Sequence, residues 1–165
     1  MRMVIAMGQD FSFGKNSTMP WQHNQKGDLA RFKALTTGGV VIMGRNTFES
    51  LGAKPLEGRV NIVVSSSIEP HPGCLTVRSI EAAADIANKQ DNPVFIIGGK
   101  RIVDGMLKYV QDIYLTIIEH EFPYSDTFLT PNLLDGFKIG ETQKFKADDK
   151  NTYDYRFELW RRDNN

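Results

Sequence analysis

The stretch "VFIIGGKRIVDGMLKYV", residues 94–110, joins a short apolar run to a pair of glycines and then to an amphipathic segment. A continuous apolar run of this length is typical of a strand that is covered on both faces of a sheet. Residues 101–110 carry apolar side chains at helical spacing. The stretch therefore predicts a buried strand, a tight turn and a helix. The helix side chains expected to face inward are Ile102, Val103, Met106, Leu107 and Val110.

Two earlier stretches repeat this order of elements. "VVIMGRNTFESL" (40–51) predicts a strand that ends at Gly44, followed by a helix over 45–51. "RVNIVVSSS" (59–67) predicts a strand that runs into three serines. Strands that alternate with helices favour a mostly parallel sheet with helices packed on its faces.

The remaining segments complete the pattern. Residues 8–27 contain glycines, a proline and many polar side chains, and they predict a long loop of the kind that is usually functional. Residues 137–145 and 153–161 alternate in hydrophobicity around the turn "ADDKNT", which predicts a hairpin. The other expected elements are strands at 3–7, 74–78 and 112–122, a helix at 28–37, and a helix at 79–89 with Ser79 as its N-cap. We predict a single α/β domain over residues 1–165, with a mixed, mostly parallel sheet and a C-terminal antiparallel hairpin.

Composition and charge exclude several classes of protein. The 165 residues carry 20 Lys+Arg and 20 Asp+Glu, so the chain lacks the basic excess of a nucleic-acid binder. Cys74 is the single cysteine, so no internal disulfide is possible, which is typical of a reducing cytoplasm. The cysteine and three histidines have no metal-site spacing. The apolar run of "MRMVIAMG" is too short for a signal peptide, and no stretch is long enough to span a bilayer, so we expect a cytoplasmic protein without membrane contact.

Polar residues collect where three predicted strands end. "IMGRNT" and "IIGGKR" each place glycine and cations at the start of a helix, and "VSSS" places hydroxyl groups past a strand. Ligands of open α/β sheets bind beyond the carboxyl ends of the strands, and helix N-termini attract phosphate. The chain has neither the G-x-G-x-x-G nor the G-x-x-x-x-G-K-[ST] pattern. The three junctions together still indicate a nucleotide or dinucleotide site.

Asp28 is the residue whose role the sequence leaves open. With a helix over 28–37, it shares one helix face with Phe32 and Leu35, both of which should point inward. One interpretation is an N-cap, although Arg31 stands where a capping box has Glu or Gln. The other is a buried carboxylate that accepts two parallel hydrogen bonds from a ligand such as an aminopyrimidine.

The ordered motifs resemble the dihydrofolate reductase family almost from end to end. The resemblance implies NADPH-dependent reduction of 7,8-dihydrofolate to 5,6,7,8-tetrahydrofolate, with hydride transfer to pterin C6 and protonation at N5. It also implies an eight-stranded sheet with about four helices, a monomer, and binding of diaminopyrimidine and pteridine antifolates. The motifs are "VIAM", "MPW", "GDLARFKALT", "VIMGRNTFESLG", "PLEGRVNIVVSS", "VFIIGG", "IYLTII" and "YRFELWRR".

The resemblance implies roles for residues on the substrate side. Asp28 should contact N3 and the 2-amino group of the pterin, Thr116 should bridge to Asp28, and Trp21 should hold an ordered water; these three are the expected catalytic residues. Arg59 should clamp the α-carboxylate of the glutamate tail. The full substrate set is Ile5, Ala6, Met7, Asp28, Leu29, Phe32, Leu51, Leu56, Arg59, Ile97 and Thr116.

The resemblance also implies a cofactor set. Gly98 and Gly99 should be joined by a cis peptide bond, Arg78 should assist with the 2′-phosphate, and residues 8–24 should form a mobile lid. The residues expected at NADPH are Met7, Phe13, Gly14, Thr18, Gly44, Arg45, Asn46, Thr47, Val64, Ser65, Ser66, Arg78, Ile97, Gly98, Gly99, Lys100, Arg101, Ile102 and Thr127.

The sequence departs from the family pattern at several points. Six residues separate Trp21 from Asp28, more than in the shorter bacterial enzymes, and Val103 replaces a tyrosine of many members. Arg31 has no expected role. Two rival functions share this type of scaffold: a pyrimidine reductase of riboflavin synthesis and a non-catalytic nucleotide-binding protein. Neither requires the combination of Asp28, Trp21 and Arg59.

Overall fold

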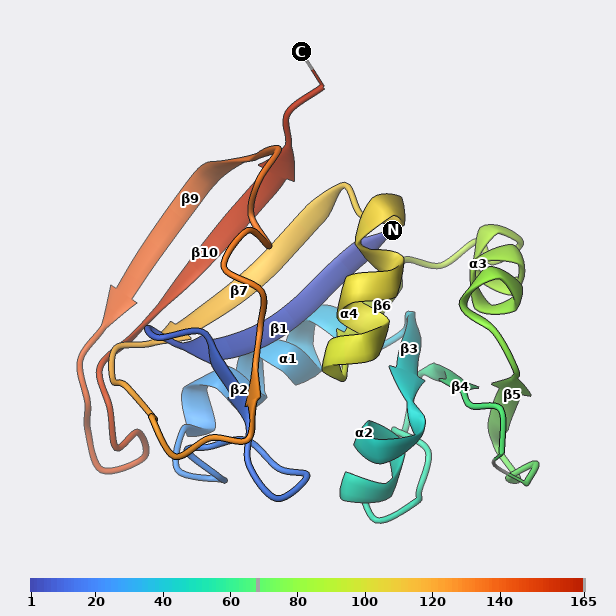
Figure 1. Ribbon diagram of the computed structural model, residues 1–165, viewed down its shortest axis with the longest axis horizontal. Helices are drawn as coiled ribbons and strands as arrows, with labels where there is room; N and C mark the ends of the chain where they lie inside the picture. Colours follow the sequence, from blue (N-terminus) through green and yellow to red (C-terminus); the bar gives the residue numbers. More distant parts are fainter. Residues whose placement is uncertain (68, 165) are drawn as a thin grey trace. The chain divides into compact units, whose positions relative to one another are not determined.

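The computed structural model describes residues 1–67 and 69–164, which form ten strands, four α-helices and one 3-10 helix (Figure 1). The elements are β1 (Arg2–Gly8), β2 (Ser12–Gly14), α1 (Lys26–Thr36), β3 (Val40–Gly44), α2 (Arg45–Ser50), β4 (Val60–Val64), β5 (Cys74–Val77), α3 (Ile80–Asn88), β6 (Val94–Gly98), α4 (Lys100–Met106), η1 (Leu107–Tyr109), β7 (Asp112–Ile118), β8 (Thr127–Phe128), β9 (Phe137–Phe145) and β10 (Tyr155–Arg162).

Eight of these strands form one sheet in the order β5-β4-β3-β6-β1-β7-β10-β9. The pairs β5–β4, β4–β3, β3–β6 and β6–β1 are parallel, whereas β7–β10 and β10–β9 are antiparallel. The predicted fold class is therefore confirmed. Ser79 caps α3 as predicted, because its hydroxyl accepts a hydrogen bond of 3.1 Å from the backbone N–H of Ala82.

Several of the predicted boundaries are wrong. The strand expected at 112–122 ends at Ile118, because the chain turns away from β10 after that residue. The expected loop 8–27 contains β2, which pairs with β8. Because β8 lies more than a hundred residues later, the sequence around β2 does not reveal this pairing. The first helix begins at Lys26, two residues before Asp28, because distant backbone and side-chain groups satisfy its first N–H groups. The last strand begins at Tyr155, since residues 147–152 and their flanks form a longer turn than predicted.

The described chain divides into two compact units. Unit 1 comprises Met1–Met3 and Ala34–Val110, and unit 2 comprises Val4–Lys33 and the chain from Gln111 onward. In unit 1 the strands β3, β4 and β6 are mostly apolar because helices cover them: α4 packs on β6 and β3, and α3 packs on β4 and β5. The exception in β4 is Asn61, which is buried and forms hydrogen bonds with the backbone of Leu56 and Arg59. None of the helices in the described residues is long and apolar enough to cross a membrane.

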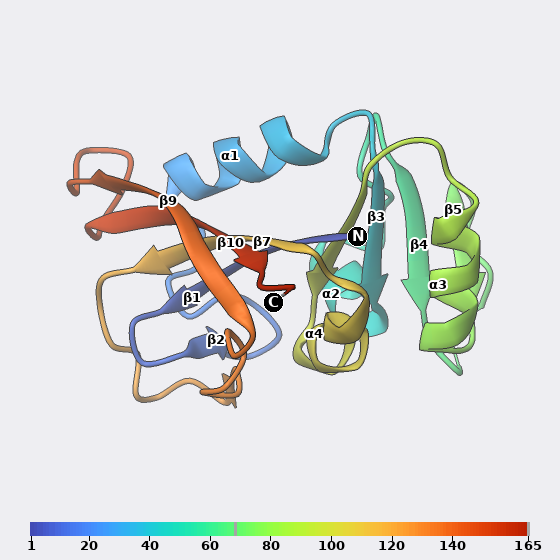
Figure 2. The same cartoon turned by 90° about the horizontal axis from the view of Figure 1, so that it is seen from above.

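In unit 2 the antiparallel strands β7 and β10 present two different faces. The register pairs Thr116 with Phe157 and Tyr114 with Leu159, so these four side chains lie on one face of the sheet. In Figure 2, α1 runs along one face of the strands β1, β7 and β10, and β2 lies on the opposite side of these strands.

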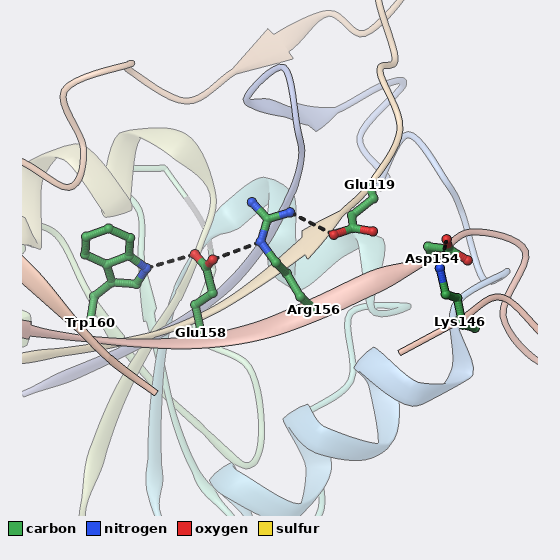
Figure 3. A network of polar contacts seen from close by, with 6 residues as sticks. All are labelled: Glu119, Lys146, Asp154, Arg156, Glu158 and Trp160. Carbon is green, nitrogen blue, oxygen red and sulfur yellow. Dashed lines mark hydrogen bonds and ion pairs between the residues drawn. The ribbon is translucent and has the colours of Figure 1, made fainter. Parts of the chain in front are cut away.

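The opposite face of β10 carries a polar chain of contacts (Figure 3). Arg156 donates hydrogen bonds to Glu119 (3.0 Å) and Glu158 (2.9 Å), and the Trp160 indole donates to Glu158 at 3.0 Å. Glu158 is buried, and a buried carboxylate without partners would be costly. The alternation along β10 therefore separates this ion network from the apolar face that looks toward α1.

The turn between β9 and β10 caps the start of α1. The backbone N–H of Gly27 donates to the side-chain oxygen of Asn151 at 2.8 Å, and the N–H of Lys26 donates to the carbonyl of Lys150 at 3.1 Å. Asn151 is buried and its amide also donates to Asp148 at 3.0 Å. The helix that carries Asp28 is thus started by a tertiary contact and not by a local capping residue.

We expect Asn151→Ala to lower the free energy of unfolding by about 1–2 kcal/mol, because it leaves the Gly27 N–H without its acceptor and removes one of the hydrogen bonds that the Asp148 carboxylate accepts. Denaturant unfolding of the variant beside wild type measures this loss. Asn132→Ala, at an exposed turn position, serves as the control and should unfold like wild type. Equal stability of the two variants would contradict the capping role.

Candidate functional site

The carboxyl ends of β4, β3 and β6 lie side by side in unit 1. These strands are neighbours and parallel, so the three polar junctions singled out in the sequence meet along one edge of the sheet. The backbone N–H of Ser65 also bonds the carbonyl of Val77 at 2.9 Å, which brings the end of β5 and the following Arg78 to the same edge. The structure thus gathers segments that are more than fifty residues apart in the sequence.

Two arginines meet at the serine turn after β4. Arg45, the first residue of α2, donates to the hydroxyl of Ser67 at 3.0 Å, and Arg78 donates to the carbonyl of Ser66 at 3.4 Å. Both arginines are exposed, so their donors remain accessible to a ligand. Two guanidinium groups and several hydroxyls at one turn suit a phosphate group.

Glycines bring the backbone close to this edge. Gly44 and Gly99 occupy the N-cap positions of α2 and α4, and neither makes a side-chain capping bond. A Cβ at Gly44 would lie 3.1 Å from the Ile102 side chain, so a larger residue would crowd the turn. The peptide bond between Gly98 and Gly99 is cis, as expected from the resemblance.

Arg59 is pre-positioned within unit 1. Its guanidinium donates to the hydroxyl of Thr36 at 3.1 Å and to the carbonyl of Glu57 at 2.9 Å. Thr36 is fully buried at the end of α1, so it provides a fixed anchor. These two bonds restrict the rotamer of Arg59 while leaving part of its planar fork for a carboxylate.

In unit 2, Asp28 lies in the first turn of α1, so the N-cap interpretation is wrong. Its carboxyl group accepts a hydrogen bond from the hydroxyl of Thr116, which is buried on β7. Burial raises the pKa of Asp28 above its ordinary value, although the Thr116 hydrogen bond and the positive charge of Arg31 act in the opposite direction. A desolvated carboxyl group in this position is the expected partner of a polar ligand.

Trp21 has a buried indole N–H without a hydrogen-bond partner among the described residues. The residue is 2% exposed and packs with Ile118 and Tyr155, yet its indole N–H has no hydrogen-bond acceptor among the described residues. Leaving a buried donor unsatisfied costs about 1–3 kcal/mol. The donor is therefore suited to a water or a ligand atom beside the apolar cluster.

Three expected cofactor residues meet elsewhere in unit 2. Gly14 of β2 pairs with Thr127 of β8, and a Cβ at Gly14 would lie 3.4 Å from Thr127 and 3.7 Å from the carbonyl of Thr18. Lys15 and Thr18 form a β-bridge, which holds this small hairpin closed. Gly14, Thr18 and Thr127 thus occupy one small surface.

The predicted residues divide between the two units. Unit 2 holds Ile5, Ala6, Met7, Phe13, Gly14, Thr18, Trp21, Asp28, Leu29, Phe32, Thr116 and Thr127, and unit 1 holds Gly44, Arg45, Asn46, Thr47, Leu51, Leu56, Arg59, Val64, Ser65, Ser66, Arg78, Ile97, Gly98, Gly99, Lys100, Arg101 and Ile102. Their contacts to substrate and cofactor stay predictions. The described residues contain no cluster of His, Cys, Asp or Glu that could hold a metal ion.

Sequence reasoning missed three residues. Ser67 bonds Arg45, and Glu49 forms an ion pair with the same arginine at 2.8 Å. Arg31 interacts with the charge of Asp28. The two residues are three positions apart on one helix, and this spacing could have predicted their interaction from the sequence. The spacing of four residues between Arg45 and Glu49 could likewise have predicted their ion pair.

Comparison with known proteins identifies the family. A model of the family described as "Dihydrofolate reductase" matches residues 1–162. The chain is 35% identical over 162 residues to the dihydrofolate reductase of Bacillus subtilis, covering 98% of this chain and 94% of that protein, and 37% identical over 155 residues to that of Haemophilus influenzae, covering 94% of each. It is also 38% identical over 156 residues to a bifunctional dihydrofolate reductase-thymidylate synthase of Paramecium tetraurelia, covering 93% of this chain but only 33% of that protein.

A solved structure shares the fold. The dihydrofolate reductase of Enterococcus faecalis, complexed with NADP(H) and RAB-propyl, superposes with a TM-score of 0.91 at 27% identity and covers 99% of this chain and 96% of its own. An α/β sheet whose parallel strands end in glycines, hydroxyl groups and arginines is typical of proteins that bind nucleotides. The family match across nearly the whole chain makes the assignment specific: the chain belongs to the dihydrofolate reductase family.

We expect Asp28→Asn to stabilise the ligand-free protein at neutral and alkaline pH. A carboxyl group whose pKa is raised on folding binds its proton more tightly in the folded state, so stability is lost as pH rises through the folded pKa. Asn removes this loss and can still accept the Thr116 hydrogen bond.

Thermal melting across pH 4–9 measures this difference. The melting temperature of Asp28→Asn relative to wild type should rise with pH and level off above the folded pKa. A difference that is independent of pH would show that the carboxyl group carries no desolvation cost.

Proposed function

We propose that this chain catalyses the NADPH-dependent reduction of 7,8-dihydrofolate to 5,6,7,8-tetrahydrofolate. The observation that supports this proposal is the desolvated Asp28 carboxyl group with its Thr116 partner. The chain also matches the dihydrofolate reductase family over residues 1–162. A carboxylate with two free oxygen lone pairs suits the N3 and 2-amino donors of a pterin. NADPH, when bound, supplies the hydride that is transferred to pterin C6.

Asp28 is the proposed pterin anchor. Its carboxylate accepts two parallel hydrogen bonds from the pterin edge, and Thr116 holds its orientation. Its negative charge favours the added proton at N5 electrostatically. The proton itself comes from water, because on the family pattern N5 lies beyond direct reach of this carboxyl group.

Trp21 is the proposed holder of that ordered water. The support is its buried indole N–H, which has no acceptor within the described part of the chain. The ring packs against Phe122 with a centroid separation of 5.6 Å, so its position is set by the surrounding aromatic side chains. Trp21 therefore offers a fixed donor beside the apolar cluster that it forms with Ile118 and Tyr155.

Arg59 is the proposed clamp for the glutamate tail. Its bonds to Thr36 and Glu57 orient the guanidinium before any ligand arrives, which reduces the entropy lost on binding. The residual donors form a fork that matches the geometry of one carboxylate.

The proposed NADPH residues fit the group that they would hold. Arg45 and Arg78, on either side of the serine turn, can neutralise the 2′-phosphate, and the uncapped N-termini of α2 and α4 offer backbone N–H groups to the diphosphate. Gly99, at the N-cap of α4, places no side chain in front of these N–H groups.

Residues 8–24 are the proposed lid. The segment holds four non-glycine residues in the left-handed region, Phe11, Asn16, Ser17 and Gln22, which is a concentration of unusual backbone geometry typical of functional loops. The Asn16 N–H donates to Asp126 at 2.8 Å, the Asp126 N–H donates to the carbonyl of Gly14 at 3.0 Å, and the Leu129 N–H donates to the carbonyl of Phe11 at 2.8 Å. Opening of the proposed lid requires these hydrogen bonds to break. A monomeric state, a cytoplasmic location and binding of diaminopyrimidine or pteridine antifolates stay predictions.

A spectrophotometric assay tests the proposed function. Purified protein should oxidise NADPH, followed at 340 nm on a scale of about seconds to minutes, only when dihydrofolate is present. Asp28→Asn should lose turnover at neutral pH while remaining folded. Oxidation that depends on a pyrimidine precursor of riboflavin would favour the rival reductase, and absence of oxidation would favour a non-catalytic nucleotide-binding protein.

We expect Arg45→Ala to weaken NADPH selectively. The loss of a charge-assisted hydrogen bond of about 1.5–3 kcal/mol should raise the KM for NADPH roughly tenfold or more, and leave the KM for NADH nearly unchanged. Lys54→Ala, at an exposed position of unit 1 outside the serine turn, is the matched control. An equal rise for both cofactors would place Arg45 away from the 2′-phosphate.

A further inference from the structure

Arg31 is held in place by three groups on the face of β7 and β10 that carries Thr116. Its guanidinium donates to the carbonyl of Leu115 at 3.3 Å, and its central carbon lies 4.2 Å from the ring centroid of Phe157 and 5.7 Å from that of Tyr114. Stacking on an aromatic face and bonding to a buried strand together restrict a side chain that is otherwise flexible. Arg31 is therefore a fixed positive charge and not a solvated surface cation.

This charge lies near Asp28 without occupying its oxygens. The two residues are three positions apart on α1, so their side chains leave the same side of the helix. Their opposite charges interact, yet no ion pair of 4.0 Å or less joins them among the residues that the structure describes. Arg31 consequently leaves the lone pairs of the carboxylate to Thr116 and to a ligand's donor pair.

Other polar groups surround the Asp28 carboxyl group. Thr116 on β7 donates a hydrogen bond to it. Burial raises the pKa of the Tyr155 hydroxyl on β10, and the negative charges of Asp148 and Asp28 raise it further. Tyr114 on β7 interacts with Arg31. Among these groups Arg31 is the one with a positive charge, so it is the one that can offset the cost of a buried carboxylate by Coulomb attraction.

We propose that Arg31 is a positioning residue that keeps the Asp28 carboxyl group ionised before substrate binds, and thereby sets the pH range over which the site accepts its ligand. The inference rests on the proposed function only for the identity of that ligand. Leu115, Phe157 and Tyr114 hold the guanidinium at a distance where it stabilises the negative charge but does not compete with the ligand for the carboxylate oxygens.

A purely structural role makes a different prediction. If Arg31 served only to pack α1 against β7 and β10, then neutral side chains that preserve the packing would leave the titration of Asp28 unchanged. If its charge is what matters, a neutral replacement raises the pKa of Asp28 and a lysine does not.

The test is a carboxyl-carbon NMR titration of ligand-free protein labelled with ¹³C-aspartate, with the Asp28 signal assigned by its loss in Asp28→Asn. Arg31→Met keeps an unbranched apolar side chain, and Arg31→Gln keeps a planar N–H donor for the Leu115 carbonyl, so that two independent neutral variants are available. Arg31→Lys retains the charge. Lys33→Met removes an exposed positive charge from the same helix and is the matched control.

We expect both neutral variants to raise the pKa of Asp28 by about 1 unit or more, since a nearby opposite charge lowers a carboxyl pKa by roughly 1–3 units. Arg31→Lys and Lys33→Met should titrate like wild type. The pH profile of kcat/KM for dihydrofolate provides a second measurement. Its apparent pKa that reports on Asp28 should rise in the neutral variants, as the pKa from the NMR titration does.

Two results would overturn the proposal. One is a wild-type titration of Asp28 in a folded Arg31→Met or Arg31→Gln protein. The other is a shift in Arg31→Lys as large as that in Arg31→Met, since that would assign the effect to packing. A wild-type protein that does not reduce dihydrofolate would instead contradict the proposed function, and the NMR titration would still decide the role of Arg31.

Discussion

A carboxyl group removed from water is the constraint around which unit 2 is arranged. Asp28 lies in the first turn of α1, where desolvation disfavours its negative charge. Three features of the surrounding structure respond to this cost. Thr116 donates to the carboxylate from β7, Arg31 brings a positive charge, and the turn at 148–153 fixes the start of the helix that positions both charged residues. A function that required no polar ligand would gain nothing from this arrangement.

Unit 1 brings together the groups that we propose for phosphate binding, although the chain has no single long phosphate-binding motif. Parallel pairing of β4, β3 and β6 places three strand ends at one edge, and the β5 strand adds Arg78 to it. Each junction contributes little alone: a short helix, a serine or one arginine. The sheet brings these contributions together at one edge, on a chain whose net charge is zero. This is why overall charge says nothing about the site, whereas strand order does.

The predictions from sequence succeeded where the signal is local. Apolar runs located β3, β4 and β6, and the Ser79 cap and the glycine pair were recognisable from adjacent residues. The predictions failed where the partner lies far along the chain. β2 forms by pairing with β8, and the start of α1 at Lys26 depends on hydrogen bonds to Asn151 and Lys150. The neighbouring residues in the sequence therefore do not predict either element correctly.

The sequence by itself determined the class of fold, the family and the residue types available to the site, because periodicity, glycine turns and ordered motifs are properties of neighbouring residues. Only the tertiary structure decided what Asp28 and Arg31 do. Asp28 is a desolvated carboxyl group and not a helix cap, since the cap comes from the turn at 148–153. Arg31 is a fixed charge and not a solvated one, since Leu115 and Phe157 hold it. Burial and long-range Coulomb attraction depend on which distant segments meet, and that is settled only when the chain folds.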